Sequence, residues 1–400
     1  MSSPHGGALR LLFLCLVCIG IGHSMLFSIL PPAARAIGLS PFQVSTIFAT
    51  SATIWVFVSP WWGRRSDIRG RRPIILSGLL GYALSMFSLA VVIEIGRAKL
   101  LPAAVVYPML IVSRSLFALL GSGTGPASQA YVADRTSRSE RTAGVALVSA
   151  AIGVGETIGP GIGAALAALA LLAPLYLSAG LAVVSAFLIH RFLPEPGPPV
   201  EHTAPRPPRL SLRDARVAPF VAVSAALQAV RATTMITLAF FLQDTLALSA
   251  EQTVQYSGIG FVTFAVAGLV AQLVLVQRFQ PTARQMLRAG VPLTLAAYVI
   301  LAVAGTYPAY LVALALLGVG IGLMRPGSSA GASLSVGAHE QGAVAGLVSG
   351  VAVVGNVVGP MLGTSLYALS PIGPYVLNAV IMTGAWALLF ANPRLRTLRA

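Results

Sequence analysis

The chain has few charged residues and very few acidic ones. Only 9% of its 400 residues are charged, with 11 Asp and Glu against 26 Lys and Arg, and its mean hydropathy is +0.84. An ordinary soluble domain carries roughly 25% charged residues. So few charges could not cover the surface of a soluble protein of this length. The deficit excludes the soluble class and indicates a membrane protein.

Cysteine and catalytic motifs are also scarce. The two cysteines, Cys15 and Cys18, lie one helical turn apart in an apolar run, where free Cys behaves as a small hydrophobic residue. No second Cys or His cluster completes a metal site, so we expect no metal. The G-x-x-x-x-G-K-[ST] signature of ATP-driven proteins is missing. No catalytic constellation is visible, and we expect neither an enzyme nor a cofactor.

Long apolar runs dominate what is there. Twelve of them are long enough to cross ~30 Å of hydrocarbon as helices. The predicted spans are 9–31, 42–63, 73–95, 102–131, 142–167, 170–190, 218–243, 253–277, 288–305, 308–332, 342–368 and 371–391. The first run is too long for a signal peptide, so we expect it to be the first membrane helix.

Basic residues gather in alternate loops between these runs. Of the 26, 20 lie near the N-terminus, at the C-terminus, or in the loops around 64–72, 135–141, 191–216 and 278–288. The opposite loops hold only Arg35, Arg97 and Lys99. This asymmetry places both termini in the cytoplasm. The net charge of +15 is therefore explained by arginines that lie beside the anionic headgroups of a lipid bilayer, rather than by binding of nucleic acid. We expect a multi-pass protein of the bacterial inner membrane.

The second half of the chain repeats the first. ERTAGVALVSAAIGVGETIGPGIG at 140–163 and EQGAVAGLVSGVAVVGNVVGPMLG at 340–363 share ten of 24 aligned residues. Internal repetition of a long apolar chain is typical of secondary transporters. We predict an all-α membrane protein with twelve transmembrane helices in two pseudo-symmetric six-helix bundles. Residues 1–190 form the first bundle, 191–217 a proline-rich cytoplasmic linker, and 218–400 the second bundle, in a monomer.

One charged motif lies between the second and third spans, where residues 63–73 read GRRSDIRGRRP. Gly63 permits a close helix approach, and Gly70 permits a tight turn. Asp67 supplies a carboxylate that can pair with arginines or cap a helix.

A second motif, GETIGPGIG at 155–163, belongs to the fifth span. Gly155, Gly159 and Gly163 recur every four residues, which gives a smooth face for close helix packing. Pro160 lacks an N–H group, so the carbonyl of residue 156 loses its helical partner and the helix can bend.

The first motif resembles the G-x-x-x-D-x-x-G-R-R signature of the major facilitator superfamily, and the second resembles the motif of its drug:proton antiporters. Arg114 and the segment AYVAD at 130–134 look like the tetracycline and multidrug efflux branch. The resemblance covers essentially the whole chain. The chain departs from it at Gly22, where tetracycline exporters typically carry an aspartate, and at Ala164, where a glycine is common.

The resemblance implies roles for these residues. The first motif would latch the cytoplasmic side in the outward-open state, through the gate residues Gly63, Asp67, Gly70, Arg71 and Arg72. The arginine of the fourth span, Arg114, would take part in proton coupling.

Glu156 is the acidic residue that falls clearly inside a span, which costs several kcal/mol. It is either a proton carrier or one half of a structural ion pair with an arginine of a neighbouring helix. Its counterpart in the repeat, Asn356, cannot titrate. His23 is either a neutral hydrogen-bonded histidine or a second titrating group.

Spans 1, 4, 7 and 10 line the cavity in this superfamily, and polar or aromatic residues there are substrate candidates. The predicted cavity residues are His23, Phe27, Arg114, Gln129, Gln228, Arg231 and Arg325 in these spans, together with Asn356 in the eleventh span. Arg325, beside Pro326, has the alternative role of satisfying freed carbonyls. Three buried arginines against one glutamate favour neutral or anionic substrates.

These features together predict a proton-coupled secondary active exporter of small amphipathic compounds that works by alternating access. Its partners are a small-molecule substrate and protons. One alternative is a carrier of an anionic metabolite or a metal-chelating compound. Another is a membrane sensor that has the same fold but does not transport.

Overall fold

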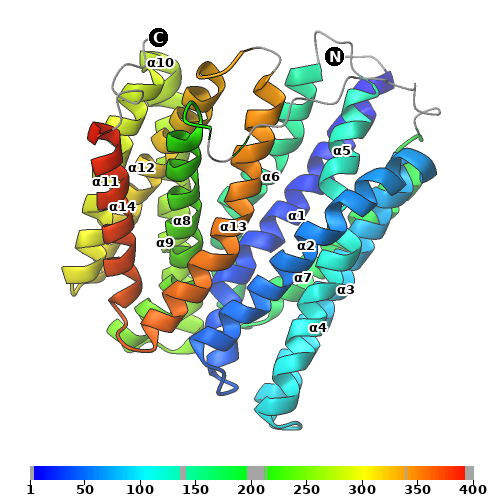
Figure 1. Ribbon diagram of the computed structural model, residues 1–400. Helices are drawn as coiled ribbons and strands as arrows, with labels where there is room; N and C mark the ends of the chain where they lie inside the picture. Colours follow the sequence, from blue (N-terminus) through cyan, green and yellow to red (C-terminus); the bar gives the residue numbers. More distant parts are fainter. Residues whose placement is uncertain (1–3, 136–140, 196–210, 212–213, 338–339, 392–400) are drawn as a thin grey trace. The chain divides into compact units, whose positions relative to one another are not determined.

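The computed structural model describes residues 4–135, 141–195, 211, 214–337 and 340–391, and this part of the chain is helical with no strand. Twelve helices are long and apolar enough to span a membrane, which confirms the predicted all-α membrane fold. The first six spans are formed by α1 (Pro4–Arg35), α2 (Pro41–Arg69), α3 (Arg71–Arg97), α4 with α5 (Ala103–Gly121 and Thr124–Ala133), α6 (Arg141–Ala167) and α7 (Ala173–Phe192). Figure 1 shows them in order from blue to green.

The other six spans follow the same order. They are formed by α8 (Ala218–Thr245), α9 with η1 and α10 (Ala250–Val270, Ala271–Val276 and Gln277–Phe279), α11 (Ala283–Val303), α12 (Tyr307–Leu334), α13 (Gln341–Tyr367) and α14 (Gly373–Ala391). The segment η1 is a π-helical turn inside the eighth span.

Among the helix ends that differ from the sequence expectation are the end of α2 and the start of α11. The second span was predicted to end at residue 63, but α2 continues to Arg69, so the first half of the charged motif is helix rather than loop. The break comes at Gly70, whose φ of 94° is accessible to glycine at little cost. The helix α11 begins at Ala283 rather than 288, because Thr282 and Gln285 form a capping box.

The chain divides into two compact units. The first comprises Met1–His202 with Ser249–Gly258, and the second comprises Thr203–Leu248 with Ile259–Ala400. The division into bundles at 1–190 and 218–400 with a linker between them stays a prediction.

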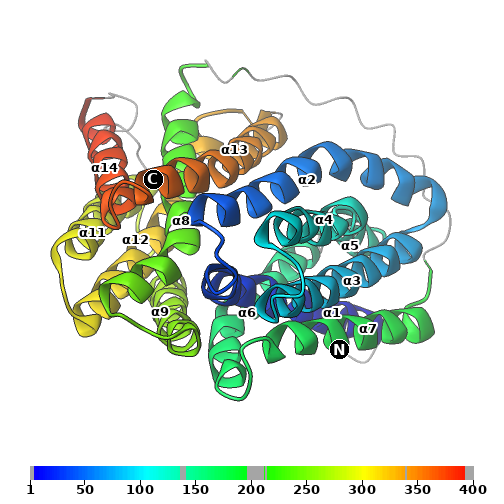
Figure 2. The ribbon, with the colours of Figure 1, turned by 90° about the horizontal axis from the view of Figure 1, so that it is seen from below.

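The two units pack their helices in the same pattern. In the first unit α1 lies against α6 and α7, and α3 lies against α4 and α7, as Figure 2 shows from below. In the second unit α8 lies against α13 and α14, and α11 lies against α12 and α14. The helices α2 and α9 are also capped in the same way at their N-termini. In each, the backbone N–H of the serine donates to the glutamine side chain and the glutamine N–H donates to the serine hydroxyl, for Ser40 with Gln43 and for Ser249 with Gln252. The repeat in the sequence is therefore a repeat in the fold.

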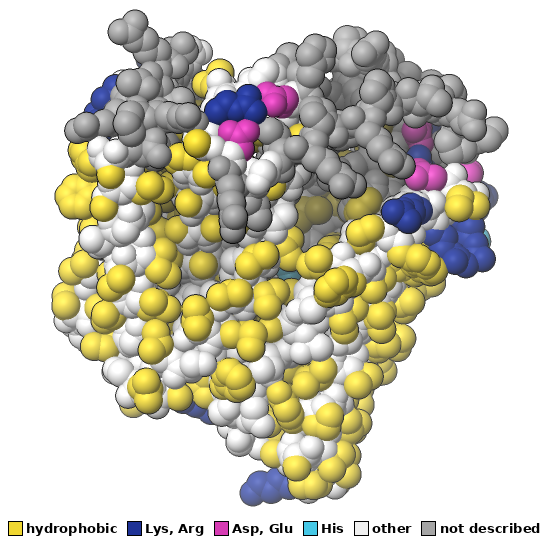
Figure 3. All heavy atoms as spheres, in the orientation of Figure 1, with side chains coloured by type: hydrophobic (Ala, Val, Ile, Leu, Met, Phe, Trp, Pro, Cys, Tyr) yellow, Lys and Arg dark blue, Asp and Glu magenta, His cyan; other side chains and the backbone are white. Residues whose placement is uncertain are grey.

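Apolar side chains remain exposed along the helices. On α3, Leu80, Leu84 and Phe87 are about half exposed and recur on one face at helical spacing. Figure 3 shows hydrophobic side chains over the middle of the visible face and charged ones near the helix ends. This is the surface expected of helices that contact hydrocarbon along their length.

Candidate functional site

The glycine face of α6 packs directly on α1. A Cβ added at Gly155 would lie 2.7 Å from the backbone nitrogen of Ile21, and one at Gly159 would lie 3.0 Å from the Cα of the same residue. At Gly163 the nearest atom would be in the Met25 side chain. The predicted close packing is observed, and the partner helix is α1.

The second unit repeats this contact between α13 and α8. Added Cβ atoms at Gly355 and Gly359 would meet backbone atoms of Ala229, and one at Gly363 would meet the side chain of Thr233. Both glycine faces thus bring a pair of helix backbones within van der Waals contact.

Glu156 and His23 face each other across the α1–α6 contact. The His23 Nδ1 atom lies 3.8 Å from the Glu156 Oε1 atom, and the side chains are 35% and 45% exposed. The two groups form an ion pair when the imidazole is protonated. One alternative from the sequence was an ion pair between Glu156 and an arginine of a neighbouring helix. In the structure a histidine, His23, lies beside Glu156. This pairing joins two residues that the sequence singled out separately.

An aromatic row extends from His23 to Arg114. The imidazole lies 5.6 Å from the Phe27 ring, and Phe27 is stacked on Phe48 with ring centroids 5.1 Å apart. The Arg114 guanidinium lies 5.9 Å from the Phe48 ring and 5.4 Å from the Phe117 ring. Phe48 and Phe117, from α2 and α4, were missed by the sequence analysis, because aromatic residues in apolar spans give no signal of their own.

Arg114 is 4% exposed, and its Nε and Nη1 atoms have no hydrogen-bond partner among the described residues. A buried donor without an acceptor costs about 1–3 kcal/mol, and more when it is charged. The two aromatic faces offset part of this cost through cation–π attraction. The guanidinium therefore keeps two donor atoms without an acceptor among the described residues.

The charged motif gathers around Arg71, which is 7% exposed. Its guanidinium donates to the carboxylate of Asp67 on α2, to Asp134 Oδ2 at the end of α5 at 3.1 Å, and to Ser66 Oγ at 2.8 Å. Arg72 donates to the carbonyl of His190 at the end of α7. The ends of four helices are thus joined by two arginines.

Gly63 does not have the close neighbour that the sequence led us to expect. A Cβ added there would meet no atom within 4 Å among the described residues. The contact in this turn of α2 is made by the next residue back, Trp62, whose indole N–H donates to the carbonyl of Leu119.

The predicted residues of the second unit lie on three helices. Gln228 and Arg231 belong to α8, Arg325 to α12 and Asn356 to α13. Gln228 lies at the glycine face, since its Cβ would be 3.0 Å from one added at Gly355. Arg325 is exposed, whereas Arg231 and Asn356 are half-buried.

An ion-pair cluster at the start of α8 and α13 was not predicted. Arg216 donates to both carboxylate oxygens of Glu340 at 2.9 Å and also binds Asp214. The Arg216 guanidinium and the N–H of Gly337 lower the pKa of the Glu340 carboxyl below its ordinary value. Arg216 and Glu340 are far apart in sequence, so their pairing could not be read from it. The one signal in the sequence was the position of Glu340 just before an apolar run, which indicates a helix start.

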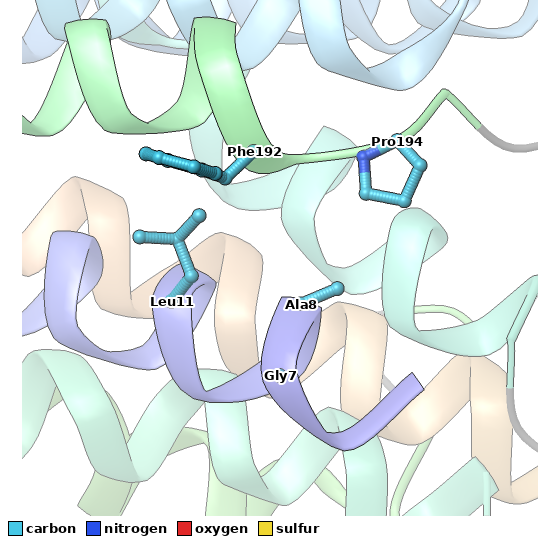
Figure 4. Close-up of a pocket in the computed structure, with 5 residues that line it drawn as sticks. All are labelled: Gly7, Ala8, Leu11, Phe192 and Pro194. Atoms are coloured by element: carbon cyan, nitrogen blue, oxygen red, sulfur yellow. The ribbon is translucent and has the colours of Figure 1, made fainter. Parts of the chain in front are cut away.

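A cleft of about 420 Å³ opens between the ends of α1 and α7. Figure 4 shows Leu11 and Phe192 facing one another across it, with Ala8 and Pro194 at one side. None of the predicted cavity residues lines this cleft. Gln129 lies on α5, where it is exposed. The assignment of the eight residues to a substrate cavity stays a prediction.

Similar proteins are transporters and drug-resistance proteins. The chain is 27% identical over 380 residues to multidrug resistance protein 1 of Bacillus subtilis, covering 93% of this chain and 92% of that one. It is 28% identical over 367 residues to the class C tetracycline resistance protein of Escherichia coli, covering 88% and 87%. A quinolone resistance protein, NorA of Staphylococcus aureus, is 26% identical over 179 residues, or 44% and 42% of the two chains.

Solved structures share the fold. A bacterial homologue of the human lysosomal transporter Spinster, in an inward-facing and occupied conformation, superimposes with a TM-score of 0.74 at 15% identity over 98% of both chains. The human organic anion transporter MFSD10 gives 0.66 at 19% identity over 97% of this chain and 100% of that one. Residues 12–351 match the Major Facilitator Superfamily. The chain therefore belongs to the major facilitator superfamily of membrane transporters, and its relatives lie in the drug-efflux branch.

Proposed function

We propose that the protein is a proton-coupled exporter of small amphipathic compounds that works by alternating access as a monomer. The observation that carries this proposal is the Glu156–His23 pair on the glycine face between α1 and α6. A carboxyl and an imidazole 3.8 Å apart can gain or lose a proton. An Arg–Glu pair, in contrast, would stay charged. The absence of side chains on the α6 face lets the two helices shift against one another.

The Arg71 cluster is the proposed gate on the cytoplasmic side. The guanidinium is shared between Asp67 and Asp134, so a shift of α2 relative to α5 must break at least one of these ion pairs. Such a cluster favours one arrangement of the helix ends and is broken in the other, which is what a two-state gate requires.

The aromatic row supports amphipathic substrates. Phe27 and Phe48 present stacked rings that pack against flat apolar groups, and Arg114 adds a donor at the end of the row. Names of the relatives, which include multidrug, tetracycline and quinolone resistance, are consistent with such compounds.

The proposed location is the bacterial inner membrane, with both termini in the cytoplasm. The test uses single cysteines at Gly305 and Gly337, both exposed, in a background with Cys15 and Cys18 replaced by alanine. An impermeant thiol reagent added to intact cells is expected to label Gly305→Cys and to spare Gly337→Cys. The reverse pattern would overturn the orientation.

The function is tested with purified protein in liposomes under an imposed pH gradient. Wild type is expected to move substrate uphill, while Glu156→Gln still binds and exchanges substrate but no longer accumulates it. Glu251→Gln, at an exposed helix start, is the matched control and should accumulate substrate normally. Uphill transport by Glu156→Gln with an unchanged pH profile would show that Glu156 is not the proton carrier.

A carrier of anionic metabolites is the second candidate, favoured by the buried guanidinium of Arg114 without an acceptor. The structural similarity to a protein named an organic anion transporter is in keeping with it. A panel of compounds matched in size but cationic, neutral, anionic or metal-chelating separates the candidates. Export of anions in preference to neutral drugs favours this carrier, and binding without flux of any compound favours a sensor.

A further inference from the structure

The residues that follow α7 dock on other helix ends of the first unit. We call Leu193–Glu195 the strap. The carbonyl of Pro194 accepts hydrogen bonds from the Tyr131 hydroxyl at 3.0 Å and from Arg135 Nη2 at 3.1 Å, both at the end of α5. The strap also borders the cleft of Figure 4 through Pro194. The start of the segment predicted as a linker is thus fixed in place.

The Glu195 carboxylate caps the N-terminus of α3. The backbone N–H of Arg71 donates to Oε1 at 2.7 Å, and that of Arg72 donates to Oε2 at 3.2 Å. The first N–H groups of a helix have no partner within the helix, and a negative charge there is stabilised by the helix dipole. The residue in the cap position, Gly70, makes no side-chain cap hydrogen bond. Glu195, 124 residues away from Arg71, supplies the missing acceptor.

Gly70 leaves room for this carboxylate. A Cβ added at Gly70 would collide with the Glu195 carboxylate oxygen and would lie 2.8 Å from its Cδ. The residue also has a φ of 94°, which L side chains rarely adopt. The glycine of the charged motif therefore permits both the turn and the approach of Glu195.

Arg71 is consequently held at both ends. Its guanidinium is bound by Asp67 and Asp134, and its backbone N–H is bound by Glu195. The side chain can reach both aspartates only while the first turn of α3 keeps its position. A carboxylate that fixes this turn therefore fixes the geometry of both ion pairs.

We propose that Glu195 is a positioning residue of the cytoplasmic gate, which acts through the first turn of α3 on Arg71. The inference rests on the proposed function, in which Asp67 and Arg71 form the gate. It adds the strap as a further part of that gate. The strap itself is thereby attached to the charged motif.

The test combines transport with hydrogen exchange on the full-length protein. Glu195→Gln removes the charge but keeps the side-chain size, and Glu251→Gln, also at a helix N-terminus, is the matched control. The carboxylate charge at a helix N-terminus is worth about twofold to fivefold in an equilibrium, and the glutamine oxygen can still accept a hydrogen bond. We expect amide exchange at residues 71 and 72 to accelerate by about this factor and Vmax of proton-driven transport to fall by a similar one. KM and the Kd of the transported compound should stay as in wild type.

A double variant separates positioning from simple structural support. If Glu195 acts through Arg71, then Glu195→Gln combined with Asp67→Asn should lose no more Vmax than the more damaging single change. Faster exchange at residues 71 and 72 with unchanged Vmax would overturn the inference, and so would losses that multiply. If Asp67→Asn also transports at the wild-type rate, the gate itself is wrong rather than Glu195 alone.

Discussion

Replacing Gly159 by alanine tests the close packing of α1 on α6. A Cβ at this position would lie 3.0 Å from the Cα of Ile21 and closer still to the carbonyl oxygen of Ile21 and the Oγ of Ser24. Ser24 cannot rotate away freely, because its hydroxyl donates to the carbonyls of Gly20 and Ile21. The collision is mainly with backbone, so the two helices must separate.

The magnitude follows from two opposing effects. Overpacking of this kind costs about 1–3 kcal/mol, while alanine gains about 0.5–1 kcal/mol over glycine inside a helix. Gly153, on the same helix, is a matched control, because a Cβ there would meet nothing within 4 Å. Gly153→Ala should show the helix gain alone. The two variants share that gain, so they differ by the overpacking cost alone, about 1–3 kcal/mol. For a unit of 150–250 residues, 1 kcal/mol shifts the melting temperature by about 2–4 °C, so the two variants should differ by about 2–12 °C.

The assay is thermal unfolding of each purified variant in detergent, followed by transport in liposomes. Gly159→Ala should melt below wild type and Gly153→Ala at or above it, and only Gly159→Ala should lose transport. The second unit repeats the test with Gly359→Ala against Gly346→Ala, where the first collides with Ala229 and the second meets open space. Equal melting temperatures for Gly159→Ala and Gly153→Ala would refute the packing argument.

Three further predictions concern charges. Asp67→Asn should insert and bind substrate normally but lose most transport, since one ion pair of Arg71 is gone, and wild-type rates would contradict the gate. Arg114→Gln should weaken binding of anionic compounds by about tenfold or more and leave neutral ones unchanged, because a charge-assisted hydrogen bond is worth about 1.5–3 kcal/mol. Equal effects on both compound classes would contradict it. The lowered pKa of Glu340 contributes stability that is fully present above the unfolded pKa near 4.5 and is lost as pH falls through the lower folded pKa. Melting of wild type and Glu340→Gln should therefore differ at neutral pH and converge in acid, and a constant difference would exclude this linkage.

Patterns within one helix were predictable from the sequence. Gly155, Gly159 and Gly163 define a face by helical periodicity alone, and the structure places another helix on that face. The apolar runs gave the twelve spans, because span length depends only on local hydropathy and bilayer thickness. The end of α2 was placed too early, since charged residues such as Arg64 and Arg65 were taken to mark a loop, whereas the helix continues past them.

Contacts between distant segments were not predictable. The partner of Glu156 depends on which helix packs on α6 and in which register, and the apolar pattern specifies neither. Glu195 caps α3 across more than 120 residues, and Arg216 binds Glu340 across a similar separation. Glu195 and Arg216 are single charged residues near helix ends. The sequence offers each of them many possible partners and no reason to prefer one.

Under the proposed function, the differences between the two repeats favour proton coupling in the first unit. Both glycine faces are retained, because each holds two helix backbones together. The charged residues beside these faces differ between the repeats. Glu156 of the first unit corresponds to Asn356 of the second, and His23 corresponds to Arg231. A guanidinium stays charged at any physiological pH, so a glutamate beside it would form a permanent pair that neither takes up nor releases protons. An amide avoids that pair, and an imidazole beside a carboxyl allows the exchange. The second unit thus keeps the packing without the titratable pair, and the proton should be exchanged where the histidine and the glutamate meet.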